Sequence, residues 1–179
     1  MHDTKIKLSD EIERHTLTVL VDNEAGVLAR VVGLFSGRGY NIESLTVAEV
    51  DPVTRTSRIT IVTSGTPAVI EQIETQLRRL VPTHKVTNWT DTRNGQKAGI
   101  EREMALIKVA GTGDRRVEAL RMADAFRARP VDTTQTSFVF EITGAPSKID
   151  SFIDLMRPLG LVEVSRTGVA AISRGPEAM

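Results

Sequence analysis

Two periods of apolar residues organise the first half of the chain. From His15 to Val21 aliphatic residues occupy alternate positions, which predicts a strand. After a turn at residues 22–26, apolar residues recur at the offsets of one helical face: Val27, Leu28, Val31, Val32, Leu34 and Phe35. Gly37 and Gly39 predict the end of this helix, because glycine readily closes a helix. An extended run from Asn41 to Val50 then predicts a second strand.

The same alternation of periods continues along the chain. Pro52 predicts the end of the preceding strand, and the β-branched run Ser57–Thr63 predicts its hairpin partner. Thr66 followed by Pro67 is typical of a helix start. The apolar face of that helix comprises Val69, Ile70, Ile73, Leu77 and Leu80. Residues 83–90 predict a fourth strand, so the order is strand, helix, strand, strand, helix, strand, as in a ferredoxin-like domain.

The same element order then starts again. Residues 91–99 contain two glycines and no aliphatic residue longer than alanine, which is typical of a linker. Beyond them the pattern predicts a strand at 104–109, a helix at 115–127, strands at 131–133 and 137–143, a helix at 147–156, and strands at 161–165 and 168–172. We therefore predict an α+β fold with two ferredoxin-like βαββαβ domains in tandem, over residues 15–90 and 100–175, after a flexible extension at 1–14.

Composition narrows the classes of function. The chain has 179 residues, of which 40% are hydrophobic, and 23 basic residues balance 23 acidic ones. A net charge of zero argues against electrostatic binding to nucleic acid or to a membrane surface. No apolar run reaches the length of a membrane helix, and the N-terminal residues lack the apolar core of a secretory signal. We therefore expect a cytoplasmic protein.

Catalytic and metal-binding patterns are missing from the sequence. It has no cysteine, and its three histidines, at positions 2, 15 and 84, lie far apart, so neither thiol chemistry nor a metal site is expected. No serine nucleophile motif and no phosphate-binding loop is found. We expect no catalytic residues in this chain.

The turn at Asn23–Gly26 is the strongest candidate for binding. A helix start presents unpaired N–H groups and the positive end of the helix dipole, which together attract a carboxylate or a phosphate. Val27 and Leu28 follow at once, so an anion there would lie beside aliphatic side chains. This combination favours a small aliphatic amino acid over a nucleotide. The alternative is an ordinary helix start capped by Asn or Asp, which is much commoner.

Two long runs resemble a known family. Residues 23–36 (NEAGVLARVVGLFS) and 38–47 (RGYNIESLTV) are similar to the small regulatory subunits of acetolactate synthase, also called acetohydroxyacid synthase. Shorter matches are EQIE at 71–74, QL at 76–77, IERE at 100–103, SRTG at 165–168 and SRG at 173–175. The resemblance covers about residues 15–175. The N-terminal extension and a somewhat longer stretch near 91–99 depart from the family.

The resemblance implies an ACT domain at residues 15–90, which pairs with the same domain of a second chain. The feedback ligand, valine or another branched-chain amino acid, would lie between the two domains. Asn23, Gly26, Val27 and Leu28 would supply the helix-start side of this site. Asn41 and Ile42 would come from the partner chain. The preference among valine, leucine and isoleucine is left open.

The resemblance also implies a partner enzyme. Residues 100–175 would bind and activate the large catalytic subunit, which makes the first committed intermediates of branched-chain amino acids. Thiamine diphosphate, FAD and Mg²⁺ would belong to that subunit, and no cofactor is expected in this chain. Its stoichiometry, and the surface that contacts it, are left open. Two alternatives are an amino-acid-sensing transcription regulator, which needs a DNA-binding helix pair or basic face, and a free-standing ferredoxin-like enzyme.

Overall fold

The computed structural model describes residues 11–93, 96–97 and 99–179. Most of the predicted extension at 1–14 therefore lies outside the described residues. The chain divides into two compact units. The first unit comprises Met1–Ile100 together with Ala171–Met179, and the second unit comprises Glu101–Ala170.

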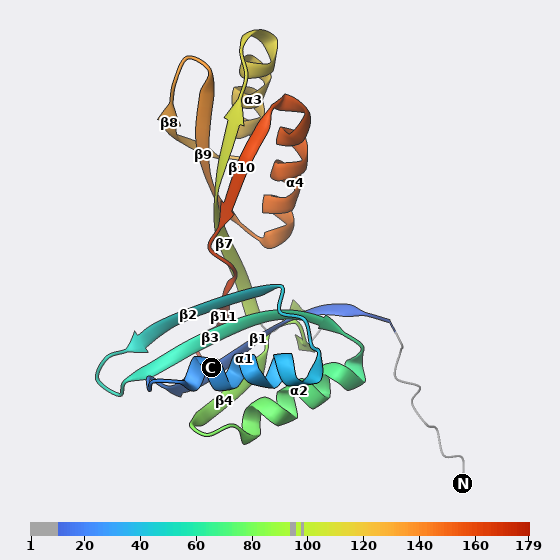
Figure 1. Ribbon diagram of the computed structural model, residues 1–179, viewed down its shortest axis with the longest axis vertical. Helices are drawn as coiled ribbons and strands as arrows, with labels where there is room; N and C mark the ends of the chain where they lie inside the picture. Colours follow the sequence, from blue (N-terminus) through green and yellow to red (C-terminus); the bar gives the residue numbers. More distant parts are fainter. Residues whose placement is uncertain (1–10, 94–95, 98) are drawn as a thin grey trace. The chain divides into compact units, whose positions relative to one another are not determined.

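The first unit is built on a four-stranded antiparallel sheet. Its elements in chain order are β1 (Glu13–Asp22), α1 (Val27–Arg38), β2 (Ser44–Asp51), β3 (Thr56–Gly65), α2 (Pro67–Arg79) and β4 (Thr83–Asn88). The strands lie in the order β2-β3-β1-β4, which leaves β2 at one edge, and both helices lie on one side of the sheet (Figure 1). The short strands β5 (Thr92–Arg93) and β6 (Gln96–Lys97) form a separate hairpin within the stretch predicted as a linker.

The second unit repeats this strand order. Its elements are β7 (Gly99–Ala110), α3 (Gly113–Ala125), β8 (Arg129–Thr133), β9 (Ser137–Gly144), α4 (Pro146–Met156), a 3-10 helix η1 (Arg157–Leu159) and β10 (Leu161–Arg166). The last strand, β11 (Ala170–Ser173), falls almost wholly in the first unit. The sheet order is β10-β7-β9-β8, and β11 also pairs with β7. The prediction of two tandem ferredoxin-like domains is confirmed.

Alternation along the strands of the first unit separates two buried layers. Residues that face the helices form an aliphatic core with α1 and α2: Leu17, Val19, Val21, Val27, Val31, Phe35, Ile59, Ile61, Ile70, Ile73, Leu77 and Val86. On the opposite face, Thr18 and Thr60 are buried and their hydroxyls lie 3.2 Å apart. The indole of Trp89 donates to Thr18 Oγ1 at 2.7 Å, so this face is closed by hydrogen-bonded side chains.

The second unit has a different interior. Phe138, Phe140 and Phe152 form an aromatic cluster beneath α3 and α4. Elsewhere in this unit the carboxylate of Glu103, only 5% exposed, accepts two hydrogen bonds from Arg166, at 2.8 and 2.6 Å. Arg166 also donates to Asp150 at 2.7 Å. The hydrogen bonds to Glu103, followed by those to Asp150, raise the pKa of Arg166 despite partial burial. Two family-like motifs, at 100–103 and 165–168, therefore meet in space.

Several boundaries differ from the sequence-based expectation. The Thr66 cap is confirmed, because its hydroxyl accepts from the Val69 amide at 3.4 Å. However, β2 begins at Ser44 and not at Asn41, and β7 begins at residue 99 and not at 104. In α3 the residues turned inward are Ala119 and Ala123, whereas its larger aliphatic residues are exposed. Small residues fit there because the aromatic cluster fills the space beneath the helix.

Candidate functional site

The candidate site lies where β1 turns into α1. Gly26 is the N-cap of α1 with φ of 85°, and no side chain of the described residues caps this helix. The alternative of a helix start capped by Asn or Asp is therefore not what the structure shows. A Cβ added at Gly26 would meet no atom within 4 Å, so the space beside the helix start is open. The Val27 amide donates to the Glu24 carbonyl oxygen at 3.4 Å, and the next amides of a helix start without a side-chain cap can accept a carboxylate.

The β2–β3 turn holds this helix start from one side. The Asn23 amide donates to the carbonyl oxygen of Arg55 at 2.7 Å, and the Asn23 side-chain Nδ2 donates to Glu49 Oε1 at 3.1 Å. Arg55 adopts φ of 51°, unusual for a residue other than glycine. The turn is built on Asp51, whose carboxylate accepts from the backbone of Val53 and from the amide and hydroxyl of Thr54. The Thr54 hydroxyl, followed by these backbone amides, lowers the pKa of Asp51.

The loop between α2 and β4 holds the same turn from the other side. The Asp22 amide donates to the carbonyl oxygen of Pro82 at 3.2 Å, and the Asp22 carboxylate lies 2.5 Å from Nε2 of His84. Arg30, in the first turns of α1, donates to the carbonyl oxygen of Val81 at 2.8 Å. The β1–α1 turn is thus anchored at both ends, which favours a preformed site.

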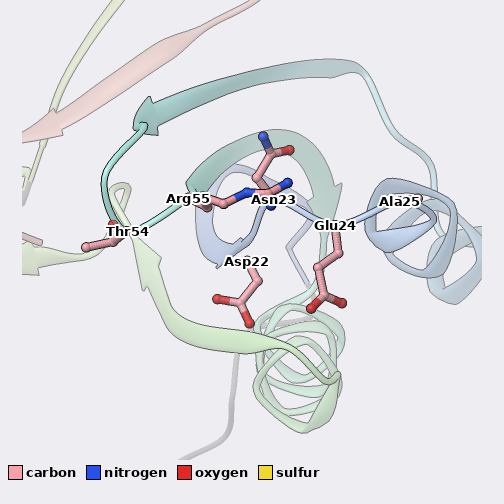
Figure 2. A pocket seen from close by; sticks show the side chains of 6 residues that line it. All are labelled: Asp22, Asn23, Glu24, Ala25, Thr54 and Arg55. Carbon is pink, nitrogen blue, oxygen red and sulfur yellow. The ribbon is translucent and has the colours of Figure 1, made fainter.

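A cavity of about 380 Å³ opens at this turn. It is lined by Asp22, Asn23, Glu24, Ala25, Thr54 and Arg55 (Figure 2). The view shows the carboxylates of Asp22 and Glu24 pointing to the side opposite the Asn23 amide. Two acidic groups and one guanidinium therefore surround a small polar cavity, suited to a compact ligand that carries both charges.

The predicted site residues fall into two groups. Asn23 lines the cavity, Gly26 follows it, and Leu28 is 41% exposed beside the helix start, whereas the Val27 side chain belongs to the core. Asn41 and Ile42 follow the far end of α1, whose 12 residues span about 18 Å. One chain therefore does not bring the two groups together, and a common site requires a second chain.

Three residues of the site were not predicted from the sequence. Glu49, Thr54 and Arg55 come from the β2–β3 hairpin and reach the helix start only through the register of that hairpin. A hairpin was predicted, but the alternating pattern does not say which turn residue faces α1.

The structure also bears on metal binding and on membrane crossing. Among the residues that it describes, no group of three or more His, Asp or Glu side chains is arranged to hold a metal ion. Within the same residues, no helix combines the length and the apolar character needed to cross a bilayer.

Comparison with known proteins identifies relatives over nearly the whole chain. Residues 17–85 match the family described as the small-subunit-like ACT domain of acetohydroxyacid synthase, and residues 102–175 match the small subunit of acetolactate synthase. The chain is 46% identical to a probable acetolactate synthase small subunit of Archaeoglobus fulgidus, over 90% of this chain and 98% of that one. It is 44% identical to the isozyme 3 small subunit of Escherichia coli, over 93% and 99%. The crystal structure of an acetolactate synthase small subunit from Thermotoga maritima superposes with a TM-score of 0.78 at 38% identity, covering 92% and 99%.

Proposed function

The chain belongs to the family of acetolactate synthase small subunits, and from this premise we propose that it confers amino-acid feedback on a large catalytic subunit in the cytoplasm. One observation carries the proposal: both units match the family, over nearly the full length of its members. The first unit would bind a branched-chain amino acid such as valine. The second would bind and activate the catalytic subunit, where thiamine diphosphate, FAD and Mg²⁺ would reside.

The geometry of the helix start supports an amino-acid ligand. The ligand carboxylate would bind the open amides of α1, and its ammonium group would bind the Asn23 oxygen. Leu28 offers an exposed aliphatic surface for the ligand side chain. Asn41 and Ile42 would complete the site from the partner chain, because they lie beyond the other end of α1 in their own chain.

Two exposed features of the first unit support pairing with a second copy. Strand β2 is an edge of its sheet, and Val47 and Val50 on it are 43% and 49% exposed. On α1 the small residues Ala29, Gly33 and Gly37 recur every four positions and are exposed. An unpaired edge strand and a helix face of small residues both allow a second chain to approach closely.

Reconstitution with a large subunit tests the whole proposal. The chain should raise acetolactate synthase activity above that of the large subunit alone, and valine should lower the activity of the complex. The purified chain should also melt about 5–10 °C higher with saturating valine, because ligand at 100 times its dissociation constant adds about 2.7 kcal/mol. Retention of DNA, or acetolactate formation by the chain alone, would favour one of the two alternatives.

Gly26→Asp tests where the ligand binds. The new carboxylate would occupy the open space at the helix start and repel the ligand carboxylate, so we expect inhibition by valine to be lost. Gly26→Ala is the matched control, because it keeps the backbone strain of a positive φ and adds neither charge nor much bulk. Normal valine inhibition of the Asp variant would contradict this placement.

A further inference from the structure

The backbone of Asn23 is held in place, whereas its side-chain amide can take either of two orientations. Its amide N–H is held by the Arg55 carbonyl oxygen at 2.7 Å, so the main chain is anchored to the β2–β3 turn. Its side-chain amide carries donors on nitrogen and an acceptor on oxygen, and exchanging the two changes little in shape. Which of them faces the cavity decides whether Asn23 attracts an ammonium group or a carboxylate.

Glu49 decides this orientation. An ionised carboxylate only accepts hydrogen bonds, so Glu49 can pair with the Asn23 nitrogen and not with its oxygen. The contact, at 3.1 Å between Nδ2 and Oε1, has this polarity. The carboxylates of Asp22 and Glu24 point to the side opposite the Asn23 amide in Figure 2 and do not compete for that nitrogen. The Asn23 oxygen is therefore left for another partner.

The hairpin places Glu49 for this contact. Glu49 pairs with Ser57 of β3, and the register shifts between Glu49 and Asp51, as at a β-bulge. A bulge changes the direction of the side chains beside it. The turn that follows is held by the hydrogen bonds to Asp51, so Glu49 and the Arg55 carbonyl are fixed on the same rigid hairpin end.

We propose that Glu49 is a positioning residue of the amino-acid site, which holds the Asn23 oxygen toward the ligand and thereby selects ligands that carry a free ammonium group. The inference rests on the proposed function and adds to it a determinant of ligand class. An ammonium group only donates, so it needs the Asn23 oxygen. The ligand carboxylate binds at the α1 amides and does not depend on Glu49.

The test reverses the orientation of Asn23. Glu49→Lys replaces an acceptor by a donor, which would bind the Asn23 oxygen and turn its nitrogen toward the ligand. Glu49→Gln still offers an acceptor. Glu71→Lys, on the exposed side of α2, makes the same change of net charge away from the turn. Calorimetric titration of the full chain with valine, and with isovalerate as the analogue without an ammonium group, provides the readout.

We expect Glu49→Lys to weaken valine binding about ten- to hundredfold, the range for losing a hydrogen bond to a charged group. Glu49→Gln should stay within about threefold of the unaltered chain, and Glu71→Lys should match it. Isovalerate binding should be unchanged or tighter in Glu49→Lys. If Glu49→Lys weakened the binding of valine and isovalerate equally, or bound valine as Glu71→Lys does, the role of Glu49 would be overturned but the proposed function would stand. An unaltered chain that binds no amino acid would overturn the proposed function as well.

Discussion

Both units place their first and third strands at the centre of the sheet, yet they keep polar groups in different places. In the first unit, Asn23 is bound by Glu49 and by the Arg55 carbonyl oxygen, and Asn23 and Arg55 line an open cavity at the turn. In the second unit, the carboxylate of Glu103 is buried and both of its oxygens are bound by Arg166. Polar groups at an open turn remain free to exchange partners with a ligand. A buried, fully paired carboxylate is committed to the fold.

The largest effect should come from breaking the buried ion pair. Arg166→Met leaves Glu103 buried without its partner, so we expect the second unit to lose about 3–5 kcal/mol of unfolding free energy. Hydrogen exchange should accelerate in α4 and β10 and stay unchanged in α2 and β4. The double variant Glu103→Met with Arg166→Met is the control, and it should recover most of the loss. Equal acceleration of hydrogen exchange in both units would show that the two units do not unfold independently.

Two glycines with positive φ sharpen the comparison. At Gly160, with φ of 105°, an added Cβ would lie 1.9 Å from the Ala110 carbonyl oxygen, whereas at Gly26 it would meet only open space. We expect Gly160→Ala to cost about 2–5 kcal/mol, from strain plus overlap, and Gly26→Ala about 1–2 kcal/mol, from strain alone. Urea denaturation of both variants checks this. Similar losses of unfolding free energy in the two variants would mean that the overlap with Ala110 does not add to the cost at Gly160.

The polar layer of the first unit is the next to test. Trp89→Phe removes the indole donor to Thr18 but keeps an aromatic ring in a buried place. We expect a loss of about 1–3 kcal/mol, confined to the first unit. A double-mutant cycle with Thr18→Val measures the coupling between the two side chains. Coupling near zero would show that the ring, and not the hydrogen bond, closes this face.

The smallest expected effect is a difference between two exposed carboxylates in how salt changes their pKa. Hydrogen bonds from uncharged donors of the turn lower the pKa of Asp51, whereas a hydrogen bond from the charged Lys108 ammonium group, followed by its charge, lowers the pKa of Glu163. Each contributes stability that is present above its ordinary pKa and is lost as the pH falls through its lowered one. In an NMR titration, 1 M salt should move the pKa of Glu163 back toward its ordinary value and leave that of Asp51 low, because ions screen a contact with a charged donor more than hydrogen bonds from neutral donors. Equal shifts would contradict these assignments.

The strand order was predictable because each element carries its own period, and a local signal such as Thr66–Pro67 marks a helix start directly. The start of β7 was not predictable, because Glu101, Arg102 and Glu103 have the composition of a polar loop. Only the structure shows that Arg166 pairs with Glu103. The period of apolar residues indicates which side chains face the core. It does not indicate which distant side chain neutralises a charge.

The helix-start residues of the candidate site were predictable for the same reason, whereas Glu49 and Arg55 were not. The turn at Asn23–Gly26 stands out because its residues are adjacent in the chain. Glu49 and Arg55 reach Asn23 through a hairpin register with an irregularity beside Glu49, and this shift decides which side chains face α1. Such a register is set by tertiary packing.

The return of residues 171–179 to the first unit bears on how the protein can be dissected. A fragment that stops at residue 100 is not the first unit, because it lacks this segment and deprives the Arg58 guanidinium of the Ala171 carbonyl oxygen, its acceptor at 3.3 Å. A stop codon near the 3′ end of the reading frame would damage the first unit and leave the second unit whole. Truncation phenotypes in this protein should therefore be mapped by compact unit and not by position along the gene.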